Sequence, residues 1–270
     1  MKEPIEITYI GYSDKMISLL LKDKRFTVKS VVSKNNAVSQ KNIDFLEKNN
    51  IFYVLDDDSS HLESYIKSDV CLIYKYGHII SKAIIDNHSF FNIHPGSIRT
   101  NRGAHPVRWS VLLGDECTYL SLYKIDGIDE GLLVNEYKLD IVDLNYEEVD
   151  SLMDQNLGKI TASLADFLSG KINPAELETV KKGTYRKKVA EADYTIDLTN
   201  DSKEIILQKI NAVSDFGGAV VFHNDIKYRV GKVYSVEDYQ KQNANAENTS
   251  DNLFLRGKDC IIKCSKYVWE

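Results

Sequence analysis

The chain has 270 residues, 43% of them hydrophobic and 27% charged, and its formal net charge at pH 7 is -6. This composition is typical of a globular protein with one large domain, or with a main domain and a smaller attached one. The acidic balance argues against a dedicated nucleic-acid binder, because phosphate binding depends on cationic surface. No apolar run reaches membrane-spanning length and the start lacks a signal-peptide core, so we expect a cytoplasmic protein with no membrane partner.

The four cysteines are Cys71, Cys117, Cys260 and Cys264. None forms a C-x-x-C pair, and no histidine lies at metal-ligand spacing from any of them. We therefore expect no metal site and a reducing compartment.

Strand-like and helix-like segments alternate through the first third of the chain. Strands are expected at residues 5–12, 26–34, 51–58, 69–76 and 90–94, and helices at 13–24, 39–50, 59–68 and 78–87. Ser13 has the residue type and place of a helix N-cap. Short strands that alternate with helices predict a parallel sheet covered on both faces.

The next part continues with a helix at 105–115, strands at 117–125 and 132–141, and a long amphipathic helix at 145–170 that ends at Gly170. Glycine is the residue most often found just after a helix end. Residues 171–189 are charged and aperiodic and resemble a linker. Short β-type runs follow at 219–223, 227–236, 252–257 and 260–267, and the polar segment 240–251 is expected to be a loop.

These patterns predict an α/β fold. A Rossmann-like, mostly parallel sheet is expected in a main domain of residues 1–180, and a small β-rich domain, a barrel or half-barrel, in residues 181–270. A dinucleotide site is not indicated, because the turn after the first strand, "IGYSDK", has one glycine and no G-x-G-x-x-G.

The stretch "SFFNIHPG" (89–96) places two polar side chains in an apolar strand. Asn92 and His94 are two residues apart and therefore point to one face, at the end of a parallel strand where α/β proteins bind ligands. Taken alone, this pair also fits a hydrogen-bonded structural role, and Asp126 and Asp129 also fit ordinary turn residues.

Five motifs that occur in order along the chain favour a functional role over a structural one. They are "YGHII" (76–80), "NIHP" (92–95), "NRG" (101–103), "AHPVRW" (104–109) and "IDEG" (128–131). Together they resemble the formyltransferase family that uses 10-formyltetrahydrofolate. "HPG" and "NRG" look like the branch that formylates nucleotide-linked amino sugars for surface polysaccharide or glycan biosynthesis. The loop after His94 departs from the His-Pro-Ser-Leu-Leu-Pro of the tRNA and glycinamide ribonucleotide enzymes.

The resemblance implies catalytic roles for Asn92, His94 and Asp129. An amide such as that of Asn92 can donate to the oxyanion of an acyl transfer. His94 could donate to that oxygen or move protons between the amine and the leaving folate nitrogen. Asp129 would orient His94 and could take the proton through a water.

The resemblance also implies two sets of binding residues. Folate would contact the two turns that contain Tyr76, Gly77, His78, Ile79, Asp126, Gly127 and Ile128. The acceptor sugar nucleotide would contact Gly96, Ser97, Asn101, Arg102, Gly103 and Trp109. Arg102 is the candidate for the diphosphate, because its fork binds oxyanions bidentately.

Two other functions stay open. A methionyl-tRNA formyltransferase would also have a β-barrel tail, but the acidic balance, the shorter tail and the altered loop argue against it. A folate- or nucleotide-binding regulator without catalysis would not need Asn92, His94 and Asp129 together. The β segments of the tail could present an edge for homodimer pairing.

Overall fold

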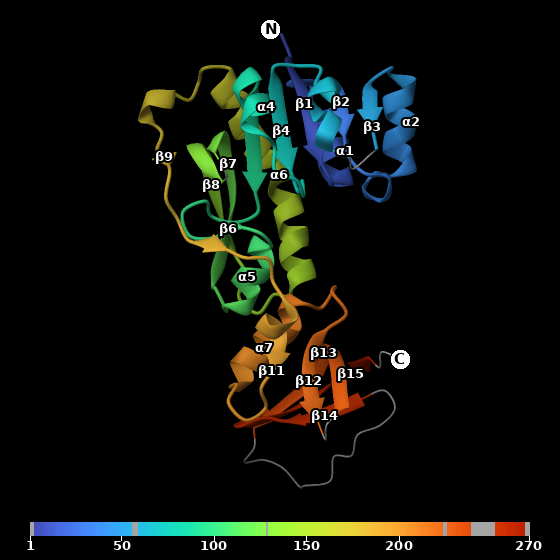
Figure 1. The fold of residues 1–270 in the computed structure, drawn as a ribbon, viewed down its shortest axis with the longest axis vertical. Coiled ribbons are helices and arrows are strands. Elements are labelled where there is room, and N and C mark those ends of the chain that lie inside the picture. Colours follow the sequence, from blue (N-terminus) through green and yellow to red (C-terminus); the bar gives the residue numbers. More distant parts are fainter. Residues whose placement is uncertain (1–2, 56–58, 128, 224–225, 239–251, 268–270) are drawn as a thin grey trace. The chain divides into compact units, whose positions relative to one another are not determined.

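The computed structural model describes residues 3–55, 59–127, 129–223, 226–238 and 252–267 (Figure 1). Contacts divide the chain into two compact units. The first unit contains Met1–Arg102, Tyr119–Lys138 and Met153–Thr184, and the second contains Gly103–Thr118, Leu139–Leu152 and Tyr185–Glu270. Two segments from the middle of the chain thus group with the C-terminal part, which the sequence pattern did not predict.

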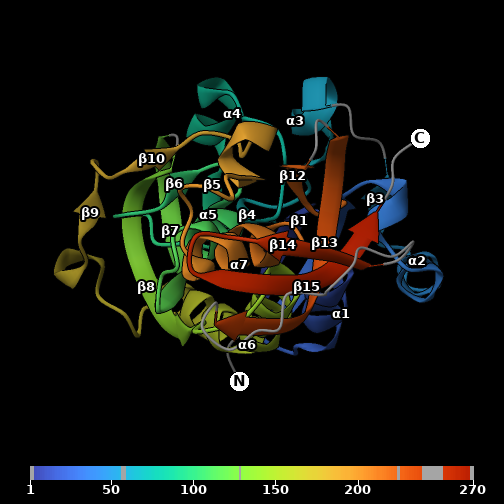
Figure 2. The same ribbon diagram turned by 90° about the horizontal axis from the view of Figure 1, so that it is seen from below.

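An eight-stranded sheet forms the centre of the first unit. Its strands, in spatial order, are β3 (Phe52–Val54), β2 (Phe26–Val32), β1 (Ile5–Gly11), β4 (Val70–Tyr74), β5 (Ser89–His94), β7 (Cys117–Gly127), β8 (Glu130–Asp140) and β9 (Thr179–Val180). The first five are mutually parallel, whereas β7 is antiparallel to β5 and β9 to β8. Figure 2 shows the sheet extending from β3 to β8. The predicted Rossmann-like, mostly parallel sheet is confirmed.

Helices cover both faces of this sheet. They are α1 (Asp14–Lys22), α2 (Gln40–Lys48), α3 (Leu62–Tyr65), α4 (Lys82–Asn87) and α6 (Tyr146–Leu168). On one face, Leu62 of α3 packs in a core cluster with Phe90 of β5. On the other face, the ring of Phe91 lies 5.6 Å from that of Phe167 in α6. Neighbouring residues of β5 therefore bury opposite faces, as expected for a central strand.

The ends of α1 and α6 follow the sequence signals. The hydroxyl of Ser13 accepts a hydrogen bond from the backbone N–H of Met16, as an N-cap does. Gly170 has φ +77°, and the N–H of Lys171 donates to the carbonyl of Asp166. This pattern satisfies the last carbonyls of α6 through a left-handed residue that favours glycine.

The second unit is built on a smaller sheet with the strand order β11 (Thr195–Ile196), β12 (Ala219–His223), β13 (Ile226–Asp238), β15 (Cys260–Tyr267) and β14 (Asn252–Arg256). The separate two-stranded sheet pairs β6 (Arg102–Gly103) with β10 (Tyr185–Arg186). Helices α5 (Pro106–Leu112) and α7 (Lys203–Ala212) also belong to this part of the fold. The four predicted β runs of the tail are confirmed as strands.

Helix α7 was not predicted from the sequence pattern. Ser202 caps its start by accepting from the N–H of Ile205, and Ile206 and Ile210 lie in the core of the second unit. A cap residue followed by apolar residues four apart is a helix signal. The predicted loop at 240–251 lies outside the described residues.

Arg108 links several parts of the second unit. Its guanidinium donates to both carboxylate oxygens of Asp215 at 2.7 and 2.8 Å and to the carbonyl of Ala212 at 2.8 Å. The guanidinium carbon also lies 3.9 Å from the ring centre of Tyr146. Removal of either partner of this buried ion pair would leave an uncompensated charge, which is strongly destabilising.

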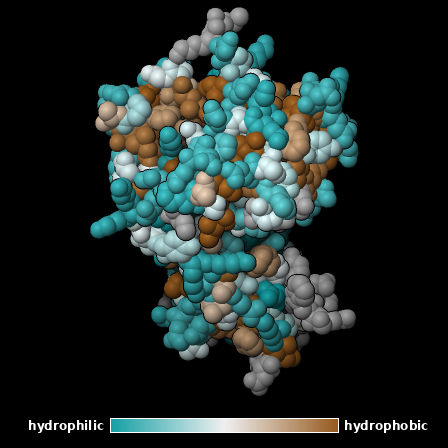
Figure 3. Space-filling view, turned by 45° about the horizontal axis from the view of Figure 1, so that its top comes forward, coloured by the Kyte–Doolittle hydropathy of each residue, from teal (hydrophilic) through white to brown (hydrophobic). Residues whose placement is uncertain are grey.

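No helix in the described ranges is both long and apolar enough to cross a membrane. On the face drawn in Figure 3, hydrophilic and hydrophobic side chains are interspersed. Single exposed apolar residues of this kind are normal for a globular surface.

Candidate active site

Asn92 sits near the end of β5 and faces Tyr123 of β7. The two residues are direct partners in the antiparallel ladder, so their side chains leave the same face of the sheet. The amide nitrogen Nδ2 of Asn92 donates to the hydroxyl of Tyr123 at 2.8 Å. This contact joins residues 31 positions apart in the chain.

Asp129 reaches the same hydroxyl from the turn between β7 and β8. The hydroxyl of Tyr123 donates to Oδ1 of Asp129 at 3.1 Å. Asp129 has φ +50°, a left-handed conformation that non-glycine residues seldom adopt. Gly131 follows at φ +152°, where a Cβ atom would lie 1.8 Å from the carbonyl oxygen of Lys124. The turn therefore requires glycine at 131, and it holds the carboxylate of Asp129 toward β7.

The environment of Tyr123 keeps its phenol protonated. Only 1% of the residue is exposed. Burial, followed by the negative charge of Asp129, raises the pKa of Tyr123 well above its usual range. The phenol therefore keeps its hydrogen, which it donates to Asp129.

His94 ends β5 and is oriented by a backbone carbonyl. Its Nε2 lies 2.8 Å from the carbonyl oxygen of Asn101, and 5% of the residue is exposed. A carbonyl only accepts, so Nε2 must carry the hydrogen of the neutral ring. The lone pair is then on Nδ1, which can accept a proton. This recorded contact of the ring comes from Asn101, and the predicted role of Asp129 in orienting His94 stays a prediction.

The loop after His94 is folded back on itself and largely buried. The N–H of Asn101 donates to the carbonyl of Ser97 at 2.8 Å, and the hydroxyl of Ser121 donates to the carbonyl of Gly96 at 2.7 Å. Ser97 is 4% and Asn101 7% exposed. These contacts set the position of the Asn101 carbonyl and, through it, the ring of His94. The predicted contacts of Gly96, Ser97 and Asn101 with the acceptor stay predictions.

Arg102 is buried and is not a surface arginine. Its residue is 5% exposed, its Nε donates to the carbonyl of Ile98, and its Nη1 lies 3.4 Å from Oε1 of Glu130. Its Nη2 is buried and has no hydrogen-bond partner among the described residues. The positive charge of Arg102 also lowers the pKa of the Tyr123 phenol, against the larger effects of burial and of Asp129. The cation therefore lies beside the turn that carries Asp129.

The predicted folate residues that the structure describes lie in the turn after β4 and at the end of β7. Gly77, His78 and Ile79 are exposed, and Ile79 is 76% exposed. The ring of Tyr76 lies 5.4 Å from that of Tyr12 and 5.3 Å from that of His78. These residues follow the carboxyl ends of β1 and β4, which are adjacent strands of the sheet.

The end of β7 borders a polar hollow. Asp126 lines a cavity of about 520 Å³ together with Asp86, His88 and Lys124. Gly127 ends β7, and Ile128 lies outside the described residues. The hollow also includes Asp69 and Ser89, which stand at the amino ends of β4 and β5, so it lies at the opposite edge of these parallel strands from His94. The binding roles of both turns stay predictions.

Gly103 and Trp109 belong to the second unit. Gly103 has φ +88°, and a Cβ atom there would lie 2.3 Å from the carbonyl oxygen of Arg186. The indole of Trp109 donates to the carbonyl of Lys187 at 2.7 Å and packs against the core that contains Ile206. Both observed roles are structural, and neither tests the predicted contact with the acceptor.

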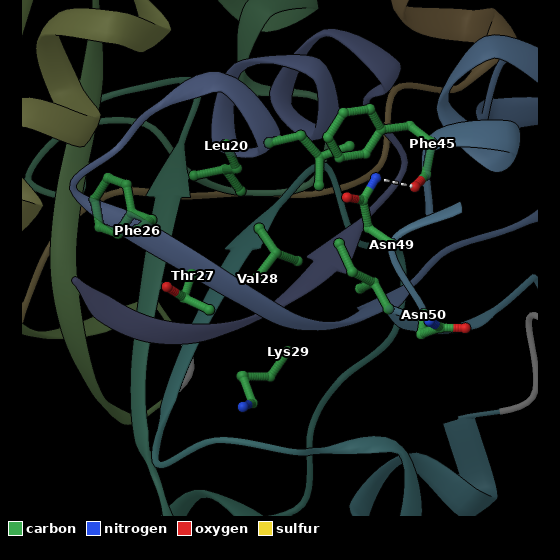
Figure 4. A pocket seen from close by; sticks show the side chains of 10 residues that line it. Leu20, Phe26, Thr27, Val28, Lys29, Phe45, Asn49 and Asn50 are labelled. Carbon is green, nitrogen blue, oxygen red and sulfur yellow. Dashed lines mark hydrogen bonds between the residues drawn. The ribbon is translucent and has the colours of Figure 1, made fainter. Parts of the chain in front are cut away.

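Another cavity, of about 390 Å³, lies between α1, α2 and the start of β2 (Figure 4). Leu20, Phe26, Val28 and Phe45 contribute its apolar wall, and Asn49 donates to the carbonyl of Phe45 at 2.8 Å. It is at the amino end of β2, whereas Asn92 and His94 lie at the carboxyl end of the parallel β5. This cavity is therefore separate from the candidate active site.

Two of the cysteines lie in surroundings that disfavour a nucleophile. Burial raises the pKa of the Cys71 and Cys264 thiols to about 12. Thiols of this kind are protonated at neutral pH and are poor nucleophiles. In the part of the chain that the structure describes, no group of three or more His, Cys, Asp or Glu side chains could hold a metal ion.

Comparison with known proteins points to one family. A formyl transferase family model matches residues 8–160. Methionyl-tRNA formyltransferase of Pseudothermotoga lettingae is 28% identical over 176 residues, which cover 63% of this chain and 56% of that relative. The chain spans 56% to 64% of the length of the first curated relatives that it matches.

Two solved structures share the fold. The sugar 3N-formyl transferase WlaRD, solved in the presence of dTDP and 5-N-formyl-THF, has a TM-score of 0.69 at 16% identity and is covered over 100% of both chains. HypX from Aquifex aeolicus, solved with tetrahydrofolic acid, has a TM-score of 0.67 at 13% identity, over 95% of this chain and 43% of that chain.

The matched region includes the strand that carries Asn92 and His94 and the turn that carries Asp129. It also covers more than half of the 270 residues. With the sheet order and the motifs described above, this match shows that the chain belongs to the formyl transferase family.

Proposed function

We propose that this protein is an N-formyltransferase that moves a formyl group from 10-formyltetrahydrofolate to the amine of a nucleotide-linked amino sugar. The observation that carries the proposal is the arrangement at the end of β5. There Asn92 and Asp129 share the hydroxyl of Tyr123, and His94 is held by the carbonyl of Asn101. Acyl transfer to an amine needs an oxyanion donor and a proton acceptor, and these residues supply both.

Asn92 supplies the oxyanion donor. One hydrogen of Nδ2 is used by Tyr123, and the nitrogen carries a second one. Directed at the formyl oxygen, that N–H stabilises the negative charge that develops as the amine adds. A donor of this kind is worth roughly 10²- to 10³-fold in rate.

His94 supplies the proton acceptor. With Nε2–H fixed on Asn101, the neutral ring accepts at Nδ1 the proton that the attacking amine loses. The same nitrogen can return that proton to the departing folate nitrogen, so the ring ends the cycle unchanged. The amine must be neutral to attack, so the rate is expected to rise with pH until the amine is deprotonated.

The residues present fit a folate donor. The turn at Tyr76 to Ile79 follows the carboxyl end of β4 and exposes backbone and aromatic groups. WlaRD and HypX, which share the fold, were solved with folates. A bound 10-formyltetrahydrofolate would supply the activated formyl group.

Three observations support a sugar nucleotide as the acceptor. The net charge of -6 disfavours a polyanion such as tRNA. The loop Gly96 to Arg99 differs from that of the tRNA enzymes. WlaRD aligns over its entire length with a TM-score of 0.69, against 0.62 for the methionyl-tRNA formyltransferase from Clostridium thermocellum, which also aligns over its entire length. The specific sugar, its carbon and its carrier nucleotide are the targets of the assay below.

Methionyl-tRNA is the second candidate acceptor, because the relative from Pseudothermotoga lettingae, like other curated relatives that match, is a methionyl-tRNA formyltransferase by name. One assay separates the two. The protein is incubated with 10-formyltetrahydrofolate and with dTDP- and UDP-linked amino sugars or charged initiator tRNA, and formyl transfer is measured. Turnover with a sugar nucleotide alone supports the proposal. Turnover with tRNA alone, together with tight and salt-sensitive tRNA binding, refutes it.

A further inference from the structure

Tyr123 packs in the apolar core and also contacts the candidate active site. Its ring packs in a buried cluster with Ile98, Leu133 and Val180, all at most 6% exposed. Its hydroxyl contacts two of the groups assigned to catalysis, Asn92 at 2.8 Å and Asp129 at 3.1 Å. A ring locked by packing and a hydroxyl locked by two hydrogen bonds leave this side chain little freedom to move.

The direction of these two bonds follows from a count of hydrogens. A phenol has one hydrogen, and a carboxylate only accepts, so the hydrogen of Tyr123 goes to Asp129. The phenol oxygen can then take part in its second bond only as an acceptor. Asn92 must therefore turn its nitrogen, and not its amide oxygen, toward Tyr123. The raised pKa of the buried phenol keeps this arrangement intact over a wide pH range.

We propose that Tyr123 is a positioning residue that fixes the rotation of the Asn92 amide, so that the second N–H of Nδ2 is held for the formyl oxygen. This inference rests on the proposed function. Asp129 acts through the phenol. Its carboxylate fixes the direction of the hydroxyl hydrogen, and the hydroxyl oxygen then fixes the rotation of the amide. Without Tyr123 the amide could rotate, and its oxygen would then repel the developing negative charge.

The kinetic test uses Tyr123→Phe, which keeps the ring in its cluster and removes only the hydroxyl. We expect kcat to fall by about 10- to 100-fold, since a small misplacement of a reacting group has effects of this size, with KM for both substrates changed less than about threefold. Tyr9→Phe is the matched control. Tyr9 is also fully buried, and its hydroxyl also makes two hydrogen bonds, to the carbonyl of Tyr74 and from the N–H of Ser13.

A double variant shows whether the effect passes through Asn92. In an Asn92→Ala background, Tyr123→Phe should lower kcat by less than about threefold, because the group that it positions is already gone. Equal losses in the two backgrounds overturn the proposal. So does an equal loss from Tyr9→Phe, which would make the effect a general result of removing a buried hydroxyl.

A second measurement needs no substrate. In protein labelled with ¹⁵N-asparagine, the side-chain amide signal of Asn92 is identified by its absence in Asn92→Ala. Its exchange with water should be slow in the parent protein and in Tyr9→Phe, and at least about tenfold faster in Tyr123→Phe, because a hydrogen bond protects an amide.

The two measurements separate the inference from the proposed function. Exchange that is unchanged in Tyr123→Phe overturns the anchoring of the amide, whatever the protein catalyses. Faster exchange in a protein that formylates none of the acceptors means that the proposed function fails while the anchoring holds. Faster exchange with unchanged kcat overturns the positioning role.

Discussion

Replacement of Asn92 by alanine is the sharpest test of the candidate active site. The change removes the N–H assigned to the oxyanion, and one such donor is worth roughly 2.7–4 kcal/mol, or about 10²- to 10³-fold in kcat. The donor acts mainly in the transition state, so KM for folate should change by less than about threefold. Release of tetrahydrofolate, followed spectroscopically while 10-formyltetrahydrofolate is varied at a saturating concentration of the acceptor, gives both constants.

The same change also has a cost in stability, which the structure allows us to estimate. Asn92 donates to the buried hydroxyl of Tyr123, and loss of a partner of a buried polar group costs about 1–3 kcal/mol. For a domain of this size each kcal/mol lowers Tm by roughly 2–4 °C. Assays are therefore run well below the melting temperature of the variant, so that the change in kcat refers to folded protein.

Asn135→Ala is the matched control. Asn135 is also partly buried, and its Nδ2 also donates to a side-chain hydroxyl at 2.8 Å, that of Ser163. It should lose stability and keep its kcat. A loss of less than tenfold in kcat for Asn92→Ala, a loss shared by Asn135→Ala, or a rise in KM alone would each refute the assignment of Asn92 as the oxyanion donor.

Three further predictions follow from burial and backbone geometry. Burial raises the pKa of Tyr9 and Tyr123, so in the unfolded chain these phenols ionise at a lower pH than in the folded one. Above about pH 10 the unfolded state therefore binds fewer protons, and the free energy of unfolding should fall by up to ~1.4 kcal/mol per pH unit for each phenol. Urea titrations at increasing pH measure this slope, and a slope unaltered by Tyr9→Phe would contradict it. Three of the four cysteines are buried and two of them, Cys71 and Cys264, have a pKa raised to about 12, so a thiol reagent at pH 8 should modify no more than one cysteine before unfolding. Rapid reaction of a second thiol in the native protein would show that these sites open. Gly131→Ala would place a Cβ atom 1.8 Å from the backbone of β7, so the turn must shift and kcat should fall by about tenfold or more. Unchanged kcat would show that the position of Asp129 is not critical.

Local patterns in the sequence predicted much of the fold. The alternation of strands and helices gave the parallel sheet, and a spacing of two placed Asn92 and His94 on one face of β5. These features depend on neighbouring residues and on the period of the backbone, which are visible in a single segment. The cap at Ser13 and the end of α6 at Gly170 have the same local origin. The domain boundary at residue 180 and the binding residues stay predictions.

Only the tertiary structure showed Tyr123 and the Asn101 carbonyl as parts of the site. Tyr123 is one of several apolar residues in its strand, and nothing local marks it. It meets Asn92 because β7 pairs with β5 in one antiparallel register, and Asp129 joins them because the turn after β7 holds a left-handed residue. Register and turn geometry are set by long-range pairing and packing, so a list of residues in order does not reveal them. The burial of Arg102 and the ring orientation of His94 were decided in the same way, by partners distant from the motif or by the backbone of a folded loop.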